Sequence, residues 1–381
     1  MIDFELTEEQ REFQQLARDF ATNEIRPVAS HYDKTGDFPM DIMRKGWEIG
    51  LMNATIPENY GGVGIGALEA VLISEEISWG CAGIGTSLMC NGLALEPLLT
   101  GATEEQKKKF LIPFAHDFNM ASFCLTERGA GSDAGSLATQ AIRKGDEYII
   151  NGSKCFITNG GYASFFTVFA VTDKERGARG LSTFWVPRDS KGITIGKHED
   201  KMGQRSSNTA EIFFDDVVVP KDNLIGREGM GFVYAMKTLD KTRPIVGAAS
   251  VGIAQAAFEY SLEYAKTRVQ FGGPIARNQA ISFMLADMKQ DIEAARLLVW
   301  KAAWMSDRKM KNSEISALCK TFASDVAMRV TTNSVQIHGG YGYTKDYPVE
   351  KLMRDAKLMQ IYEGTNQIQR LVASREILAP K

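Results

Sequence analysis

The chain has 381 residues, of which 44% are hydrophobic and 24% are charged; these proportions are ordinary for a folded globular protein, and the length predicts two or three domains. The formal net charge of −3 argues against a nucleic-acid binder, which usually carries a basic patch or stripe. Five cysteines without a C-x-x-C pair and four scattered histidines argue against a disulfide framework and predict no metal site.

The amino-terminal segment is acidic and polar. It lacks the basic and apolar regions of a signal peptide, and the chain contains no run of about 18 apolar residues that would span a membrane. We therefore expect a cytoplasmic protein with no membrane span, or a mitochondrial-matrix protein if a transit peptide has been removed.

The first third of the sequence predicts helices. Thr7-Glu-Glu-Gln10 is a capping-box signature followed by apolar residues at helical spacing, and Thr103-Glu-Glu-Gln106 repeats it. Gly61, Gly62 and Gly64 precede another expected helix near 66–79.

The sequence from about 120 to 220 changes to short β-rich runs. These runs are Ser122–Leu125, Glu147–Ile150, Phe165–Val171, Ser182–Val186 and Ala210–Val219. Turn residues rather than helices separate them, so we expect a sheet or barrel-like module and not a doubly wound parallel sheet.

Long helical patterns return from about 228. The expected spans are 230–267, 276–307, 312–337 and 347–377, and four long helices with short connections predict a bundle. The fold class is therefore multidomain α+β. Its expected parts are an N-terminal helical domain (1–118), a middle β-barrel-like domain (119–227) and a C-terminal four-helix bundle (228–381).

Two segments of the β-rich region suit a planar or phosphorylated ligand. The loop from Thr126 to Asp133 is rich in small residues, which let backbone N–H groups approach a phosphate or a flavin edge. Phe156 and Thr158 lie two apart on an expected strand and so face the same side, which suits stacking on a ring. Taken alone, the first segment could also be a turn and the second an ordinary half-buried strand.

Two segments of the helical carboxyl-terminal region carry charged groups beside helix irregularities. Asp240 and Arg243 are three apart next to Pro244, which disturbs a helix; they are either ligand contacts or an internal ion pair. Glu363 precedes Gly364, which permits a bend, so its carboxylate could enter an apolar pocket and act as a base. The alternative for Glu363 is a helix cap or a surface charge.

Together, in this order, these segments resemble the acyl-CoA dehydrogenase family, especially its short- and medium-chain members. The resemblance covers about residues 5 to 378, and it is carried by the segments Thr126–Asp133, Asp240–Pro244, Val349–Ala356 and Tyr362–Arg370. It implies the three-part fold given above, with FAD between the β-domain and the bundle.

The resemblance implies two groups of FAD contacts. The first group would touch the flavin and its ribityl-phosphate arm: Leu125, Thr126, Gly131, Ser132, Phe156 and Thr158. The second group would contact the FAD of a neighbouring subunit: Arg268, Phe271, Gln279, Gln336, Gly339, Gly340, Thr365 and Gln367. Shared cofactor sites of this kind imply a homotetramer built as a dimer of dimers.

The acyl-CoA contacts that the resemblance implies are Ser132, Asp240, Arg243, Tyr362 and Gly364. Asn91 is polar in a largely apolar stretch, and it either orients a ring in the acyl pocket or is a helix residue bonded to the backbone. Two positions depart from the family. Phe156 replaces a common Trp, which keeps stacking but loses an N–H donor, and His338 replaces a common aliphatic residue and is expected to pack or form a hydrogen bond.

The activity that the resemblance implies is FAD-dependent α,β-dehydrogenation of an acyl-CoA thioester. Glu363 would take the Cα proton, the Cβ hydride would pass to flavin N5, and an electron-transferring flavoprotein would accept the electrons. The expected substrate is a short- or medium-chain acyl-CoA; the alternative is an alicyclic one, such as cyclohexane- or cyclohexene-carboxyl-CoA. Two further hypotheses are a non-redox acyl-CoA binding protein and an oxidase or acyl-CoA reductase.

Overall fold

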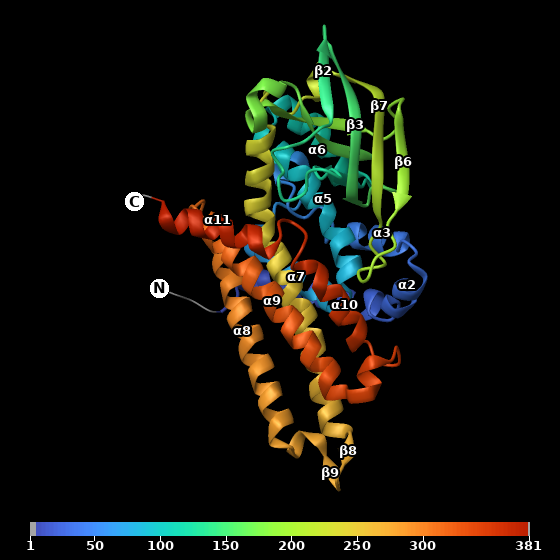
Figure 1. Cartoon of the computed structure of the whole chain (residues 1–381), viewed down its shortest axis with the longest axis vertical. Helices are drawn as coiled ribbons and strands as arrows, with labels where there is room; N and C mark the ends of the chain where they lie inside the picture. Colours follow the sequence, from blue (N-terminus) through green and yellow to red (C-terminus); the bar gives the residue numbers. More distant parts are fainter. Residues whose placement is uncertain (1–4, 380–381) are drawn as a thin grey trace.

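A helical region, a β-sheet and a second helical region follow one another in the computed structural model, which describes residues 5–379 (Figure 1). The first four and last two residues of the expected domains lie outside this range. The amino-terminal helices are α1 (Glu8–Phe20), α2 (Ala29–Thr35), α3 (Met40–Glu48), α4 (Ala67–Gly80), α5 (Ala82–Gly101) and α6 (Glu104–His116). Both expected capping boxes are confirmed: the hydroxyls of Thr7 and Thr103 accept from the backbone N–H groups of Gln10 and Gln106 at 3.2 Å.

One mixed sheet of seven strands forms the middle of the chain. The strands are β1 (Ala121–Cys124), β2 (Gln140–Lys144), β3 (Glu147–Thr158), β4 (Phe165–Val171), β5 (Leu181–Pro187), β6 (Ile193–His198) and β7 (Thr209–Pro220). Their order is β1-β4-β2-β3-β7-β6, and β5 pairs with β4. All five expected β-rich runs are confirmed. The sequence did not predict β2 and β6, because most of their side chains are only partly buried or exposed and their apolar pattern is weak.

The carboxyl-terminal helices are α7 (Gly231–Thr267), α8 (Gln279–Asp307), α9 (Ser313–His338), α10 (Val349–Met359) and α11 (Asn366–Leu378). A short hairpin of β8 (Val269–Gln270) and β9 (Gly273–Pro274) joins α7 to α8 at the end of the molecule opposite the sheet (Figure 1). One expected helix, 347–377, is wrong as a single element. It breaks into α10 and α11, and the break holds Glu363.

Helix α7 is the central element of the helical core, and it packs against α4, α8 and α9. Gly252 permits the close approach of α7 to α4, because a Cβ atom there would lie 2.1 Å from the backbone oxygen of Glu75. Among the described helices, α7 alone is long and apolar enough to cross a membrane by length and composition. Most of its apolar stretch is buried inside the structure, as is usual for a core helix.

Candidate active site

The break between α10 and α11 places Glu363 in an unusual backbone conformation. Glu363 has φ 51° and Gly364 has φ 89°, so two successive residues are left-handed. Glycine is favoured at position 364, because residues with a side chain rarely adopt this φ. The amide of Gln369 donates to the carbonyl oxygens of Glu363 (2.9 Å) and Gly364 (3.1 Å). The bend that the sequence predicted beside Glu363 is therefore present and firmly held.

The side chain of Glu363 is partly buried and points toward α7 rather than acting as a helix cap. The hydroxyl of Thr242 donates to Glu363 Oε2 at 2.6 Å. Burial raises the pKa of Glu363 above its ordinary value, because desolvation disfavours the charged carboxylate. The Thr242 hydrogen bond and the positive charges of Lys320 and Arg243 oppose this rise. Burial thus gives the Glu363 carboxylate a higher proton affinity than an exposed carboxylate has.

Asp240 and Arg243 form the internal ion pair that was one of their two interpretations. The guanidinium donates to Asp240, and the hydroxyl of Ser313 donates to the other carboxylate oxygen at 2.7 Å. Arg243 is only 3% exposed, and among the described residues nothing accepts a hydrogen bond from its Nε. Helix α7 runs through Pro244 without ending, so the expected helix irregularity is milder than the sequence indicated. The pair still lies beside Glu363, since Arg243 and Glu363 influence each other's pKa.

The Thr126–Asp133 loop and strand β3 form a second face of the site. They are joined by the backbone hydrogen bond from Cys155 to Thr126 (3.0 Å). Phe156 has φ 56° at an irregularity in the β3–β7 pairing, and its ring is 64% exposed. An aromatic ring displayed in this way from a well-paired strand is suited to stacking on a flat ligand.

A buried ion pair between Lys154 and Glu127 holds this loop in place. Lys154, 1% exposed, donates to Glu127 Oε1 at 2.7 Å and to the Leu125 carbonyl at 3.1 Å. The Glu127 carboxylate also accepts from the backbone N–H groups of Ala138 (2.6 Å) and Thr139 (3.0 Å). Contacts within the chain therefore hold the loop in a defined shape.

Cys90 on α5 connects the loop–strand face to Glu363. Its Sγ lies 3.6 Å from the carbonyl oxygen of Thr158. Burial, with a smaller contribution from the charge of Glu363, raises the pKa of the Cys90 thiol to about 12. Strand β3 and the turn that carries Glu363 are far apart in sequence. Both thus lie beside the same segment of α5.

Asn91 does not present its amide to this site. It is fully buried; its Nδ2 donates to Asn53 Oδ1 (2.9 Å) and the Asn119 carbonyl (2.8 Å), and its Oδ1 accepts from the Ala121 N–H (2.8 Å). The interpretation of Asn91 as a helix residue bonded to its surroundings fits these contacts. The expected role as a substrate contact is wrong on this geometry, because no donor of the amide is left for a ligand.

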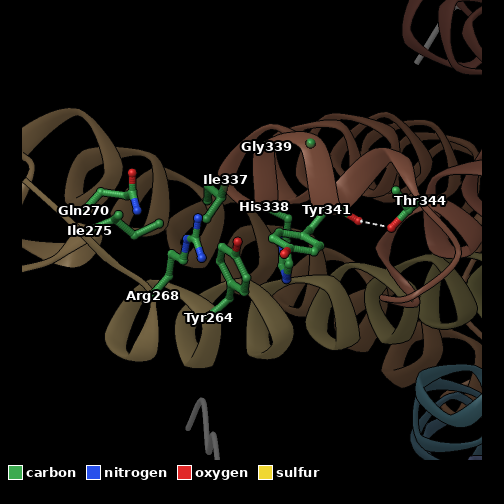
Figure 2. Close-up of a pocket in the computed structure, with 10 residues that line it drawn as sticks. Tyr264, Arg268, Gln270, Ile275, Ile337, His338, Gly339, Tyr341 and Thr344 are labelled. Atoms are coloured by element: carbon green, nitrogen blue, oxygen red, sulfur yellow. Dashed lines mark hydrogen bonds between the residues drawn. The ribbon is translucent and has the colours of Figure 1, made fainter.

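An open pocket of about 520 Å³ lies at the far end of the bundle rather than beside Glu363. Figure 2 shows its lining from the end of α7, the following hairpin and the end of α9, including Arg268, His338 and Gly339. His338 is 3% exposed, and its ring stacks on Tyr264 at 4.3 Å between ring centroids. Its Nδ1–H donates to the backbone oxygen of Ser334 at 2.8 Å. Nothing in the described range pairs with its Nε2.

The structure brings the expected site residues together in two places. Around Glu363 and the loop–strand face lie Leu125, Thr126, Gly131, Ser132, Phe156, Thr158, Asp240, Arg243, Tyr362 and Gly364. At or next to the far pocket lie Arg268, Phe271, Gln336, Gly339 and Gly340. Gln279, Thr365 and Gln367 line neither place; Gln279 and Gln367 are exposed, and the Thr365 hydroxyl caps α11 by accepting from Ile368 N–H.

The sequence did not identify Thr242, Lys320 and Gln369 as part of the site. Thr242 lies inside the 240–244 segment, and its helical spacing from Leu239 and Val246 would have placed it on the buried face. Lys320 is a charged residue on a helix face that otherwise carries small uncharged residues such as Ala317 and Ala323, which is an unusual pattern. Gln369 carries no such signal, because polar residues surround it.

The residues present fit a large flat ligand with a phosphate arm. Cβ atoms added at Gly129, Gly131, Gly339 and Gly340 would meet nothing within 4 Å, so the backbone is open to a ligand at both places. The exposed Phe156 ring and the unpartnered Nε2 of His338 supply a stacking surface and a polar contact. FAD, which the resemblance implies, has both of these chemical parts.

Three family models match the chain, and together they cover most of it. They are the acyl-CoA dehydrogenase N-terminal domain at residues 7–117, middle domain at 122–217 and C-terminal domain at 229–378. The short-chain specific acyl-CoA dehydrogenase of Clostridium acetobutylicum is 45% identical over 377 residues, which are 99% of this chain and 100% of that protein.

Solved structures show the same likeness over the whole chain. Butyryl-CoA dehydrogenase from Megasphaera elsdenii is 45% identical with a TM-score of 0.97, and the alignment covers 99% of this chain and 100% of that one. A chain from a study of the electron transferring flavoprotein of Acidaminococcus fermentans and flavin-based electron bifurcation is 47% identical with a TM-score of 0.98, with 100% of both chains covered.

Proposed function

The chain belongs to the acyl-CoA dehydrogenase family, whose members are FAD-dependent oxidoreductases, and on this premise we propose that Glu363 is the base that takes the C2 proton of a short-chain acyl-CoA. The observation that carries this proposal is the placement of Glu363. It is a partly buried carboxylate in a held turn, with a single hydroxyl donor and a raised pKa. A carboxylate in such surroundings is a stronger base than one in water.

The backbone of the same turn supplies a second element of the mechanism. No described residue accepts a hydrogen bond from the Glu363 backbone N–H. The left-handed conformation thus leaves the Glu363 N–H as a fixed donor next to the carboxylate. A thioester oxygen bound there would accept this hydrogen bond as it gains negative charge during removal of the C2 proton. A preorganised donor of this kind is worth about 3–4 kcal/mol of transition-state stabilisation.

Bound FAD supplies the acceptor for the hydride that leaves C3 of the thioester. We assign the flavin to the loop–strand face, held by Leu125, Thr126, Gly131, Ser132, Phe156 and Thr158, because that face is shaped in advance and displays an exposed aromatic ring. Asp240 and Arg243 are assigned to the acyl-CoA side. The buried Arg243 Nε that lacks an acceptor in the described range supports a polar ligand group nearby.

The substrate we propose is a straight short-chain acyl-CoA. The support comes from the relatives, which include a short-chain specific acyl-CoA dehydrogenase and a butyryl-CoA dehydrogenase. An alicyclic substrate rested on Asn91 as a ring contact, and the amide of Asn91 is occupied by protein groups. Turnover of butyryl-, octanoyl- and cyclohexanecarboxyl-CoA with an artificial electron acceptor distinguishes these substrates.

For the acceptor and the assembly we propose an electron-transferring flavoprotein and a homotetramer. The 47% identical chain from the Acidaminococcus study supports the first. The tetramer is supported by the hairpin at the end of α7, where Phe271 is fully exposed with φ 51°. A second copy of the chain would cover this aromatic side chain and complete the far pocket with its own flavin.

The substitution Glu363→Gln tests the role of the base. It keeps the size of the side chain and its contact with Thr242 but removes the proton acceptor. We expect turnover to fall by about 100-fold or more while the yellow flavin absorbance and acyl-CoA binding persist. Glu350→Gln, a matched change at a partly buried carboxylate of α10 that pairs with Arg354, is the control and should keep activity close to wild type. Activity of Glu363→Gln within a few-fold of wild type would disprove the assignment.

A further inference from the structure

Lys320, on α9, is a completely buried lysine whose hydrogen bonds go to the turn that carries Glu363. Its Nζ donates to the backbone oxygen of Gly364 at 2.9 Å and to Asn366 Oδ1 at 3.0 Å. Asn366, itself 3% exposed, is held by Ser324 and Asp325 of the same helix. The amine of Lys320 is therefore fixed between α9 and the first residues after the base.

Comparison with the other buried lysines shows what is unusual about Lys320. Lys154 donates to the carboxylate of Glu127 at 2.7 Å, and Lys351 donates to that of Asp355 at 2.6 Å. A buried ammonium group normally needs such a partner, because leaving water is costly for an unpaired charge. Lys320 makes no ion pair among the described residues; its acceptors are a backbone carbonyl and an amide oxygen.

The charged groups around Lys320 and Glu363 come from several elements. Burial, together with the charge of Arg243, lowers the pKa of Lys320 to about 8, and the charges of Glu363 and Asp325 oppose this fall. Burial raises the pKa of Glu363, and the charges of Lys320 and Arg243 lower it. Thr242 on α7 donates to Glu363, and the neutral Cys90 thiol faces it from α5. Asp325 is already bonded to Gln360, Asn366 and Arg370. Glu363 is thus the carboxylate left to balance the charge of Lys320.

We propose that Lys320 is a positioning residue for the reaction: it clamps the Gly364 carbonyl so that the left-handed turn holds Glu363 over the substrate, and its charge keeps Glu363 ionised. This inference rests on the proposed role of Glu363 as the base. The clamp is shared with Gln369, which binds the same carbonyl but carries no charge. Removal of Lys320 and removal of Gln369 therefore have different consequences.

Lys320→Met tests the proposal, because Met fills the same volume without the charge or the donors. We expect kcat to fall by about tenfold or more, KM to change by less than about threefold, and the acidic limb of the kcat profile to move to higher pH. A second measurement avoids redox chemistry. In D2O, an acyl-CoA with sulfur in place of C3 has no hydride to lose, and the rate at which its C2 protons exchange for deuterium, followed by NMR, should fall by a similar factor.

Two variants serve as comparisons. Lys351→Met removes another buried lysine and should lower the melting temperature without moving the pH profile. Gln369→Leu loosens the turn but keeps the Lys320 charge, so kcat and C2 exchange should fall while the acidic limb moves little. If folded Lys320→Met shows wild-type kcat and an unmoved acidic limb, the proposal is overturned.

Should Lys320→Met not fold, Lys320→Gln decides, because glutamine keeps an N–H donor but removes the charge: wild-type kcat with an unmoved acidic limb in this variant also overturns the proposal. A separate result would show that Glu363 is not the base. In that case Glu363→Gln would retain C2 exchange, whatever the Lys320 variant does.

Discussion

The hydroxyl of Thr242 donates a hydrogen bond to the carboxylate of Glu363 at 2.6 Å. A hydrogen bond to an ionised carboxylate stabilises the charged form, so it lowers the pKa that burial has raised. The two effects act on one proton equilibrium. Burial makes Glu363 a stronger base, and the Thr242 hydrogen bond limits how far its pKa rises above the ordinary value.

Thr242→Val should move this balance toward the protonated acid. Valine has nearly the same shape but no donor, so the pKa of Glu363 should rise further. Glu363 works as a base only when ionised; activity is therefore lost as pH falls through this pKa, and the loss should begin at a higher pH in the variant. We expect kcat near neutral pH to fall by about tenfold. Thr242→Ser keeps a hydroxyl at this position and should show the pH–activity profile of wild type. Identical pH–activity profiles for Thr242→Val and wild type would contradict this account.

Sequence reasoning predicted Glu363 as the base but did not predict the residues that contact its turn. Glu363 was recognisable because Gly364 follows it and because the whole segment resembles a known family. Thr242 and Lys320 become neighbours of the Glu363 turn only through the packing of α7 and α9 against it. The Thr242–Glu363 contact spans 121 positions and the Lys320–Gly364 contact spans 44, so no local pattern encodes them. Gln369 lies only six positions from Glu363, but the polar residues around it give no sign that its amide turns back to the Glu363 carbonyl.

Contacts between the loop that follows β1 and the strand β3 hold both segments in shape. The buried pair Glu127–Lys154 joins them, and Glu127 in turn holds the backbone at Ala138 and Thr139. Because Lys154 is buried, desolvation lowers its pKa while Glu127 raises it. The two charges stabilise the fold only as a pair.

Lys154→Met should disrupt this pair and with it the flavin face. Leaving Glu127 buried without its partner costs about 3–5 kcal/mol, which should appear as a lower melting temperature and a loss of flavin absorbance during purification. The matched control is Lys221→Met, whose partner Asp146 is on the surface and exposed, so its melting temperature and flavin content should be those of wild type. Full flavin retention in Lys154→Met would show that the loop keeps its shape without the pair.

Among the elements, those with a strong apolar pattern were predicted and those set by local geometry were not. The five β-rich runs, both capping boxes and the long helices of the carboxyl-terminal region follow from periodicity. The separation of α10 and α11 did not, because the apolar pattern continues across Ile361 and Tyr362 and resembles one helix. The turn there depends on a left-handed Glu363, which is uncommon for a residue with a side chain.

At the scale of the whole molecule, α7 connects two separate sites. It carries Thr242 and Arg243 beside Glu363, and it ends at Arg268 in the far pocket. At about 1.5 Å per residue, Thr242 and Arg268 are about 39 Å apart. This distance far exceeds the size of a single reaction centre. The resemblance assigns Arg243, near one end, to acyl-CoA and Arg268, at the other end, to the FAD of a neighbouring subunit. The two ends of α7 are therefore expected to serve different flavins in the assembly.

This length of α7 has a genetic consequence: two inactive alleles with lesions at opposite ends should complement each other. In a mixed pair of Glu363→Gln and Arg268→Glu chains, one composite centre receives both lesions and the other receives none. Hybrids isolated through two different affinity tags should regain about half of the wild-type activity per pair, whereas each allele alone stays inactive. Inactive hybrids would mean that each centre takes both Glu363 and Arg268 from the same chain. Activity in cells with two alleles would then depend only on how many functional copies are present.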